Sequence, residues 1–106
     1  MDLKGHIKRA VTIKNKYALV EIKTSGKPWS VLERTQGFMG DAGDLMKLVM
    51  AKNNLRNIDN VDEKLKHELS DCLWSILVIA DELGIDMDEE FTKSMDDLEK
   101  KILVIK

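Results

Sequence analysis

Turn-forming clusters and the one proline are confined to a few short stretches of this chain, which limits it to a small number of long helices. Its one proline, Pro28, lies close to Gly26 in the segment 24–29. A second break is the polar, turn-rich stretch 52–60, and a third is centred on Gly84. Between these breaks no segment alternates apolar and polar residues as a half-buried strand does. The sequence therefore predicts an all-α protein.

Capping residues indicate where each helix begins. Ser30 followed by Glu33 forms a capping box, Asn60 can cap the next helix, and Asp86 with Glu89 repeats the pattern further along. Four helices joined by short connections make a four-helix bundle the expected architecture. The predicted helices cover about residues 4–23, 31–52, 61–83 and 86–103.

Length and composition describe one ordinary globular domain, residues 1–106. Hydrophobic residues make up 43% and charged residues 34%, which argues against disorder, and a net charge of -2 does not favour a nucleic-acid surface. No apolar run approaches the ~20 residues of a membrane span, and the first ten residues lack the apolar stretch of a signal peptide. A single cysteine, Cys72, cannot form an internal disulfide. We therefore expect a cytoplasmic domain that binds neither membranes nor nucleic acid.

Two pairs of acidic residues, each three apart, occur in neighbouring predicted helices: Asp41 with Asp44, and Glu68 with Asp71. Residues at this spacing are neighbours on a helix, so their charges repel by a few tenths of a kcal/mol. Asp41 also falls within the apolar stripe of its helix, where an unpaired carboxylate is costly to bury. Because Mg²⁺ prefers carboxylate oxygens, one or two such ions would offset both costs. The alternative is a chance arrangement in a chain that has nineteen acids.

The third predicted helix has an apolar stripe that we expect to face the core. Glu68 and Asp71 flank this stripe, and Trp74 lies far round from its centre, at a position that favours a contact with a second subunit. The stripe follows the spacing of an amphipathic helix and consists of Leu65, Leu69, Leu73, Ile76, Ala80 and Leu83.

The four acids lie in two stretches that resemble the MazG-type all-α nucleoside triphosphate pyrophosphohydrolases: GDAGDLMKLVM (40–50) and ELSDCLWSILVIADELGID (68–86). That family has the pattern ExxE, a spacer of variable length and then ExxD, and the resemblance covers about residues 29–103. It implies Mg²⁺-dependent hydrolysis of an NTP or dNTP to the monophosphate and pyrophosphate, with Mn²⁺ as an alternative ion. The four acids would be the metal ligands and catalytic residues, and one of them would orient or deprotonate the attacking water. It also implies a homodimer, which completes the bundle, or a tetramer made of two dimers.

The sequence departs from the family pattern in two places. The first acidic pair is DxxD rather than ExxE, so each side chain of Asp41 and Asp44 is one methylene shorter. In the last helix, Asp97 stands where the family has a basic residue. These departures motivate an alternative function, that of a catalytically weakened or inactive helical dimer that acts as a binding or regulatory protein.

Three further residues are candidates for substrate binding. Lys64 precedes Glu68 by one turn, where the family also has a lysine, and Lys101 keeps a basic charge of the family's last helix. Both are expected to contact phosphate, although Lys64 could instead simply pair with Glu68 on the helix surface. Trp29 either packs as a hydrophobic staple at the start of its helix or forms a wall on which the base stacks.

Overall fold

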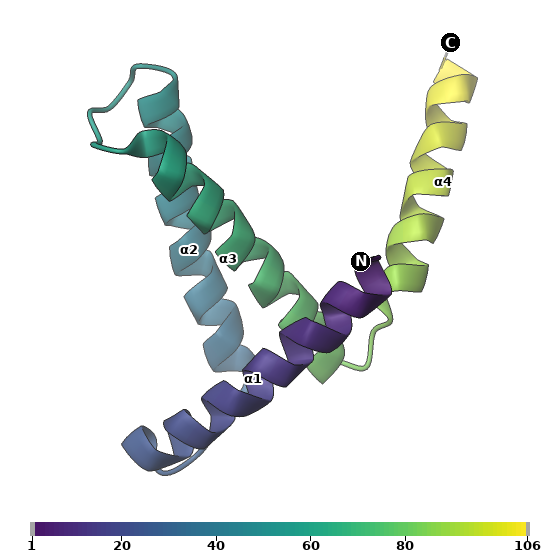
Figure 1. Cartoon of the computed structure of the whole chain (residues 1–106). Helices are drawn as coiled ribbons and strands as arrows, with labels where there is room; N and C mark the ends of the chain where they lie inside the picture. Colours follow the sequence, from purple (N-terminus) through teal and green to yellow (C-terminus); the bar gives the residue numbers. More distant parts are fainter. Residues whose placement is uncertain (1, 106) are drawn as a thin grey trace.

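The computed structural model describes residues 2–105 and contains four helices (Figure 1). No strand occurs among the residues described. The prediction of an all-α fold with four helices is therefore confirmed. The helices are α1 (Leu3–Ser25), α2 (Val31–Lys52), α3 (Val61–Glu82) and α4 (Met87–Ile105).

The ends of the helices are fixed largely by the predicted residues. The Ser30 hydroxyl accepts a hydrogen bond from Glu33 N at 3.2 Å, and the Glu33 carboxylate accepts one from Ser30 N at 3.0 Å, which completes the capping box. The Asp86 carboxylate accepts from two backbone N–H groups of the first turn of α4. Asn60 precedes α3 as expected, but its side chain makes no cap hydrogen bond and its φ is 54°. Gly84 has φ 71° after α3, a conformation that costs glycine little.

The closest packing is between α2 and α3, which run antiparallel beside each other (Figure 1). The first helix, α1, crosses α3 near its C-terminal end. After a short turn, α4 points away from the α2–α3 pair, so that the two arms form an open V (Figure 1). Among residues 2–105, no helix is both long enough and apolar enough to cross a membrane.

The core lies where α1 and α2 meet α3, and this placement corrects the predicted orientation of α3. Leu69, Leu73 and Leu83 of the predicted stripe are each more than half exposed. Because α1 and α2 both pack on the other side of α3, Glu68 and Asp71 lie on the packed face itself and not on its flank. The buried apolar residues of the chain are Ala10, Leu48, Cys72, Leu77, Val78 and Ala80.

Apolar faces on both α3 and α4 remain open in a single chain. One is the α3 stripe, which we define as the exposed residues Leu69, Leu73, Ile76 and Leu83. The other is the α4 stripe, which consists of Phe91, Met95, Leu98 and Ile102. The members of the α4 stripe recur every three or four residues and therefore share one face of the helix.

Candidate functional site

Three of the predicted acids come together between α2 and α3. Asp41, Asp44 and Glu68 offer carboxylate oxygens that all lie within 4.8 Å of one another. Asp41 and Asp44 are one turn apart on α2, and Glu68 reaches them because α3 packs along α2. We call these three residues the acidic cluster.

Glu68 has the least favourable surroundings of the three. Its Oε1 atom is buried and has no hydrogen-bond partner within residues 2–105. Burial raises the pKa of Glu68, and the negative charges of Asp41, Asp71 and Asp44 raise it further. A buried carboxylate oxygen without a partner costs free energy, which a bound cation would offset. Since every donor is a carboxylate oxygen, the cluster fits Mg²⁺ or Mn²⁺ and not a metal that prefers sulfur or nitrogen.

Asp71, the fourth predicted ligand, lies at the edge of the cluster. Its Oδ2 is 3.2 Å from Nε2 of His67, one turn earlier on α3, and its side chain is 44% exposed. It is not among the carboxylates that lie within 4.8 Å of one another. Its charge nevertheless contributes to the raised pKa of Glu68, so it lies within electrostatic range of the cluster.

Lys64 lines a cavity of about 460 Å³ beside the cluster, towards the loop between α2 and α3. Asp44 and Glu68 line the same cavity, and so do Lys47 and His67. The cavity therefore places basic side chains next to the carboxylates, an arrangement that can receive the negative charge of phosphate groups. In the sequence, the only indication that Lys47 lies beside the cluster is its spacing of three residues from Asp44, which makes the two side chains neighbours on the helix.

A second hollow, which we call the aromatic groove, lies between α1, α2 and α3 and has a volume of about 660 Å³. Its aromatic walls are Tyr17, Trp29 and Trp74, and Asp41 and Asp71 also line it. The acidic cluster is therefore flanked by a cavity with basic residues and by a groove with aromatic residues.

The aromatic rings of the groove are held by contacts within the chain. The Trp74 indole N–H donates to the carbonyl of Ala10 at 3.2 Å, and its ring centre is 5.8 Å from that of Tyr17. The prediction that Trp74 faces a second subunit is therefore wrong, because α1 covers it. A Cβ atom built on Gly37 would lie 3.6 Å from the Trp29 ring, an ordinary van der Waals distance, so the indole lies against this part of α2.

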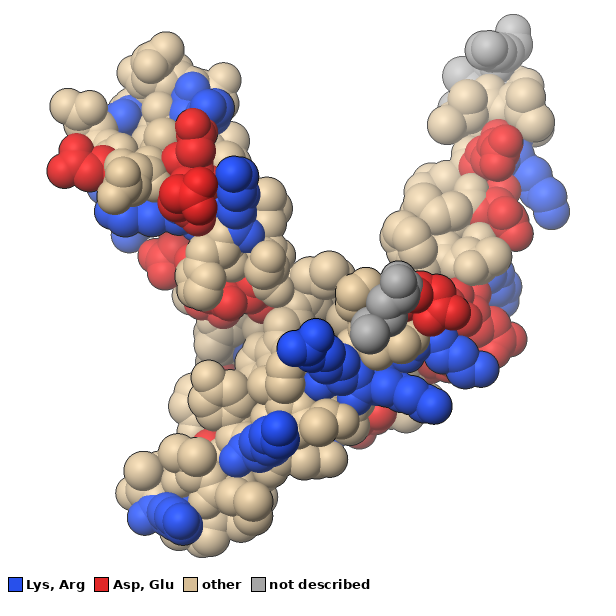
Figure 2. Space-filling view, viewed as in Figure 1, with Lys and Arg blue, Asp and Glu red and all other residues tan. Residues whose placement is uncertain are grey.

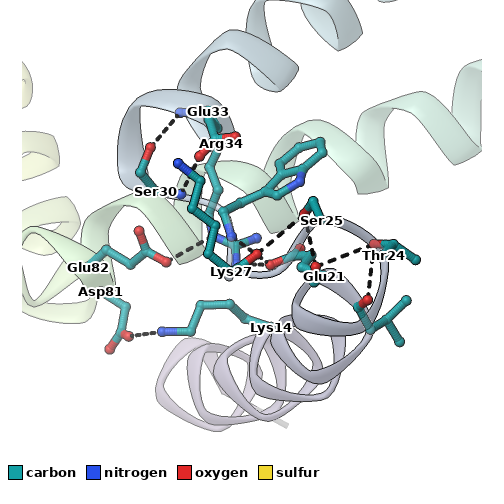
Figure 3. A network of polar contacts seen from close by, with 12 residues as sticks. Lys14, Glu21, Thr24, Ser25, Lys27, Ser30, Glu33, Arg34, Asp81 and Glu82 are labelled. Atoms are coloured by element: carbon teal, nitrogen blue, oxygen red, sulfur yellow. Dashed lines mark hydrogen bonds and ion pairs between the residues drawn. The ribbon is translucent and has the colours of Figure 1, made fainter.

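An ion-pair network that sequence reasoning missed links α1, α2 and α3 (Figure 3). Arg34 is only 7% exposed, and its Nε donates to Glu82 at 2.8 Å. Its Nη2 donates to Oε1 of Glu21 at 3.1 Å, and the same oxygen accepts from Trp29 N at 2.9 Å. Arg34 and Glu21 both line the aromatic groove.

Lys101 does not lie with the other candidates. It belongs to the last turns of α4, the arm that points away from the α2–α3 pair (Figure 1). Figure 2 shows basic side chains along α1 and both acidic and basic ones on the two arms of the V. Within one chain, Lys101 is therefore remote from the acidic cluster.

Comparisons of the chain with family models, with curated proteins and with solved structures give no match. What the protein does must therefore be inferred from the arrangement of its own residues.

Proposed function

We propose that this chain is a MazG-like hydrolase that binds a divalent cation and cleaves a nucleoside triphosphate, an NTP or dNTP, to the monophosphate and pyrophosphate. The observation that supports this proposal best is the acidic cluster, in which three carboxylates meet around the buried, unpartnered Oε1 of Glu68. A helix pair gains no stability from placing three like charges together. A ligand that carries positive charge explains the arrangement.

Asp41, Asp44 and Glu68 would hold the cation, Mg²⁺ or Mn²⁺, and Asp71 lies beside them as the fourth acid. When bound, the ion supplies positive charge that offsets the charge of the phosphoryl oxygens. Asp71 lies outside the group of three ligands and contacts His67. It is therefore the acid that would orient the attacking water and accept its proton.

The two hollows on either side of the cluster would receive the two ends of a nucleotide. Lys64 and Lys47 offer positive charges at the cavity for the polyphosphate chain. Trp29 offers a ring at the aromatic groove on which a nucleobase can stack. If a nucleotide spans both hollows, its phosphate groups lie next to the carboxylates of the acidic cluster.

A second copy of the chain would cover the α3 and α4 stripes. In a two-fold dimer, α4 of one chain can lie along α3 of the other, and the reverse contact follows by symmetry. Such a dimer would bury half-exposed residues such as Leu73 and Leu98 and complete the bundle. It would also carry Lys101 of one chain towards the helix pair of the other, where it could contact phosphate.

A tetramer of two such dimers would need a further apolar face. Leu32, Met39 and Met46 recur every seven residues on α2, and their exposed fractions are 73%, 65% and 60%. This row lies apart from the α3 and α4 stripes and is the face through which we propose that two dimers associate.

The free, buried thiol of Cys72 supports a cytoplasmic location, which we include in the proposal. A reducing compartment keeps such a thiol unmodified.

The proposal is tested by incubating the protein with each common NTP and dNTP and Mg²⁺ and separating the products. We expect pyrophosphate and the monophosphate in equal amounts, and a loss of about 100-fold or more in rate for Glu68→Gln. Glu99→Gln removes one acid from the exposed surface of α4 and serves as the matched control. The proposal is refuted if the wild type hydrolyses no nucleotide and its rate cannot be distinguished from that of Glu68→Gln at the same protein concentration.

The second candidate is a weakened or inactive dimer that binds nucleotides without cleaving them. The short side chains of Asp41 and Asp44, the acidic charge of Asp97 and the position of Asp71 outside the cluster favour it. It predicts that a nucleotide stabilises the protein against thermal unfolding in the presence of Mg²⁺ and that no pyrophosphate is released.

A further inference from the structure

The aromatic groove contains a carboxylate that the proposed function does not use, that of Glu21 on α1. Its side chain is 12% exposed. Both side-chain hydrogen bonds that Glu21 accepts, from Trp29 N and from Arg34 Nη2, end on the same oxygen, Oε1. Within residues 2–105 no hydrogen bond ends on the second oxygen, Oε2, and this oxygen is not among the buried atoms that lack a partner, so water can reach it. Glu21 therefore offers the groove an accessible acceptor.

This acceptor is held in a fixed position. Arg34 is buried and is itself anchored on α3 by its bond to Glu82, so the carboxylate of Glu21 is tied to two other helices (Figure 3). Rotating it away would leave the guanidinium partly unpaired in a buried place, which is costly. A fixed acceptor loses little entropy when it binds a ligand.

The other walls of the groove determine which ligand can reach this oxygen. Tyr17, Trp29 and Trp74 favour a flat ring, and the edge of a ring stacked in the groove would face polar groups of the wall. A carboxylate accepts a hydrogen bond from an exocyclic amino group, as it does from N4 of cytosine. A carbonyl in the same place would set its oxygen against the carboxylate and leave both unpaired.

We propose that Glu21 selects nucleobases that carry an exocyclic amino group over those that carry a carbonyl at the same position. The inference rests on the proposed function, because it names the substrate class of the same site. Arg34 acts as a positioning residue that fixes the carboxylate.

The test measures the binding of nucleosides, which lack phosphate, in buffer with EDTA. Cytidine is compared with uridine, and adenosine with inosine, because each pair differs by one amino-to-carbonyl exchange and the proton that accompanies it on the adjacent ring nitrogen. Trp29 and Trp74 both line the groove, so tryptophan fluorescence reports binding directly. We expect the amino member of each pair to bind about tenfold more tightly. Glu21→Gln should reduce this ratio to about twofold or less because an amide both donates and accepts, whereas Glu99→Gln should keep it.

Equal affinities within both pairs, tighter binding of uridine and inosine, or no saturable signal with any nucleoside would overturn the inference. An unchanged ratio in a folded Glu21→Gln protein would overturn it as well. If that variant does not fold, the two wild-type comparisons still decide. Because neither metal nor phosphate is present, a protein that discriminates nucleosides but releases no pyrophosphate keeps this inference and loses the proposed function.

Discussion

Replacing Glu68 by glutamine should have opposite effects on the stability of the metal-free and the metal-bound protein. In the metal-free chain, Glu68 is a partly buried acid with an unpartnered oxygen and acidic neighbours. Glutamine has nearly the same shape and no charge, so the substitution removes repulsion. With a divalent ion present, the same substitution removes one of its ligands.

The magnitude follows from the separation of the charges. The oxygens of Asp41, Asp44 and Glu68 lie within 4.8 Å, where two unit charges in the dielectric of water repel by about 0.9 kcal/mol. Glu68 takes part in two such pairs, and salt and partial exposure screen them, so we expect a gain of about 1–2 kcal/mol in the free energy of unfolding. In a domain of this size, the midpoint of thermal unfolding should rise by about 5–10 °C. Magnesium at one hundred times its Kd should stabilise the wild type by about 2.7 kcal/mol and leave Glu68→Gln nearly unchanged.

Thermal unfolding followed by circular dichroism, in EDTA and in MgCl2, measures both effects. The protein concentration is held constant because dimer formation would also change the midpoint. Glu99→Gln, which removes an exposed acid of α4, controls for the change in net charge. The reasoning is refuted if Glu68→Gln unfolds below the wild type in EDTA, or if magnesium stabilises both proteins equally.

Three further predictions concern pH, the ion-pair network and the dimer. Since burial and acidic neighbours raise the pKa of Glu68, the contribution of this residue to metal-free stability should be complete below the ordinary pKa of glutamate and should be lost as the pH rises through the raised value; the difference in urea unfolding between the wild type and Glu68→Gln across pH checks this, and an equal fall in Glu68→Gln would contradict it. Arg34→Met removes the ion-pair partner of Glu82 and leaves Glu21 with only the Trp29 N–H, and since both acids are partly exposed it should lower the free energy of unfolding by about 1–3 kcal/mol; a urea midpoint near that of the wild type would refute the role of the network. Leu98→Lys places a charge in the α4 stripe and should convert the proposed dimer to a monomer in light scattering, with helix content unchanged; a persistent dimer would mean that this face is not the interface.

The helix limits could be predicted because the signals for them are local. Ser30 and Glu33 are three residues apart and satisfy each other's backbone N–H groups, whatever the rest of the chain does. Gly84 likewise ends the α3 region by its own conformation. Such signals need no knowledge of tertiary packing.

The buried face of α3 could not be predicted in the same way. Leu69 and Leu73 form the most regular apolar stripe of this helix, yet each is 53% exposed in the single chain. The side that α1 and α2 cover is set by contacts between distant segments, and it carries Cys72 and Val78 together with acids. A regular stripe shows that a face will be covered, but it does not show whether the same chain or a second copy covers it.

The candidate site could be predicted only in part. The spacing of the acids and the place of Asp41 in an apolar stripe pointed to a meeting of α2 and α3, where three acids do lie together. The contact of Asp71 with His67 depends on side-chain rotamers, which helical spacing does not fix. The position of Lys101 depends on the direction in which α4 leaves the turn after α3. The Arg34 network needs three helices at once, so no local pattern could reveal it.

The measurement that tests the central claim most directly is a titration with Mn²⁺ followed by electron paramagnetic resonance, which distinguishes free from bound ion. If carboxylates of α2 and α3 hold a divalent cation, the wild type will bind Mn²⁺ in competition with Mg²⁺. Glu68→Gln and Asp41→Asn will then weaken binding by about tenfold or more, and Glu99→Gln will bind as the wild type does. A wild type that leaves all Mn²⁺ free, or a Glu68→Gln protein that binds it equally well, would contradict the claim.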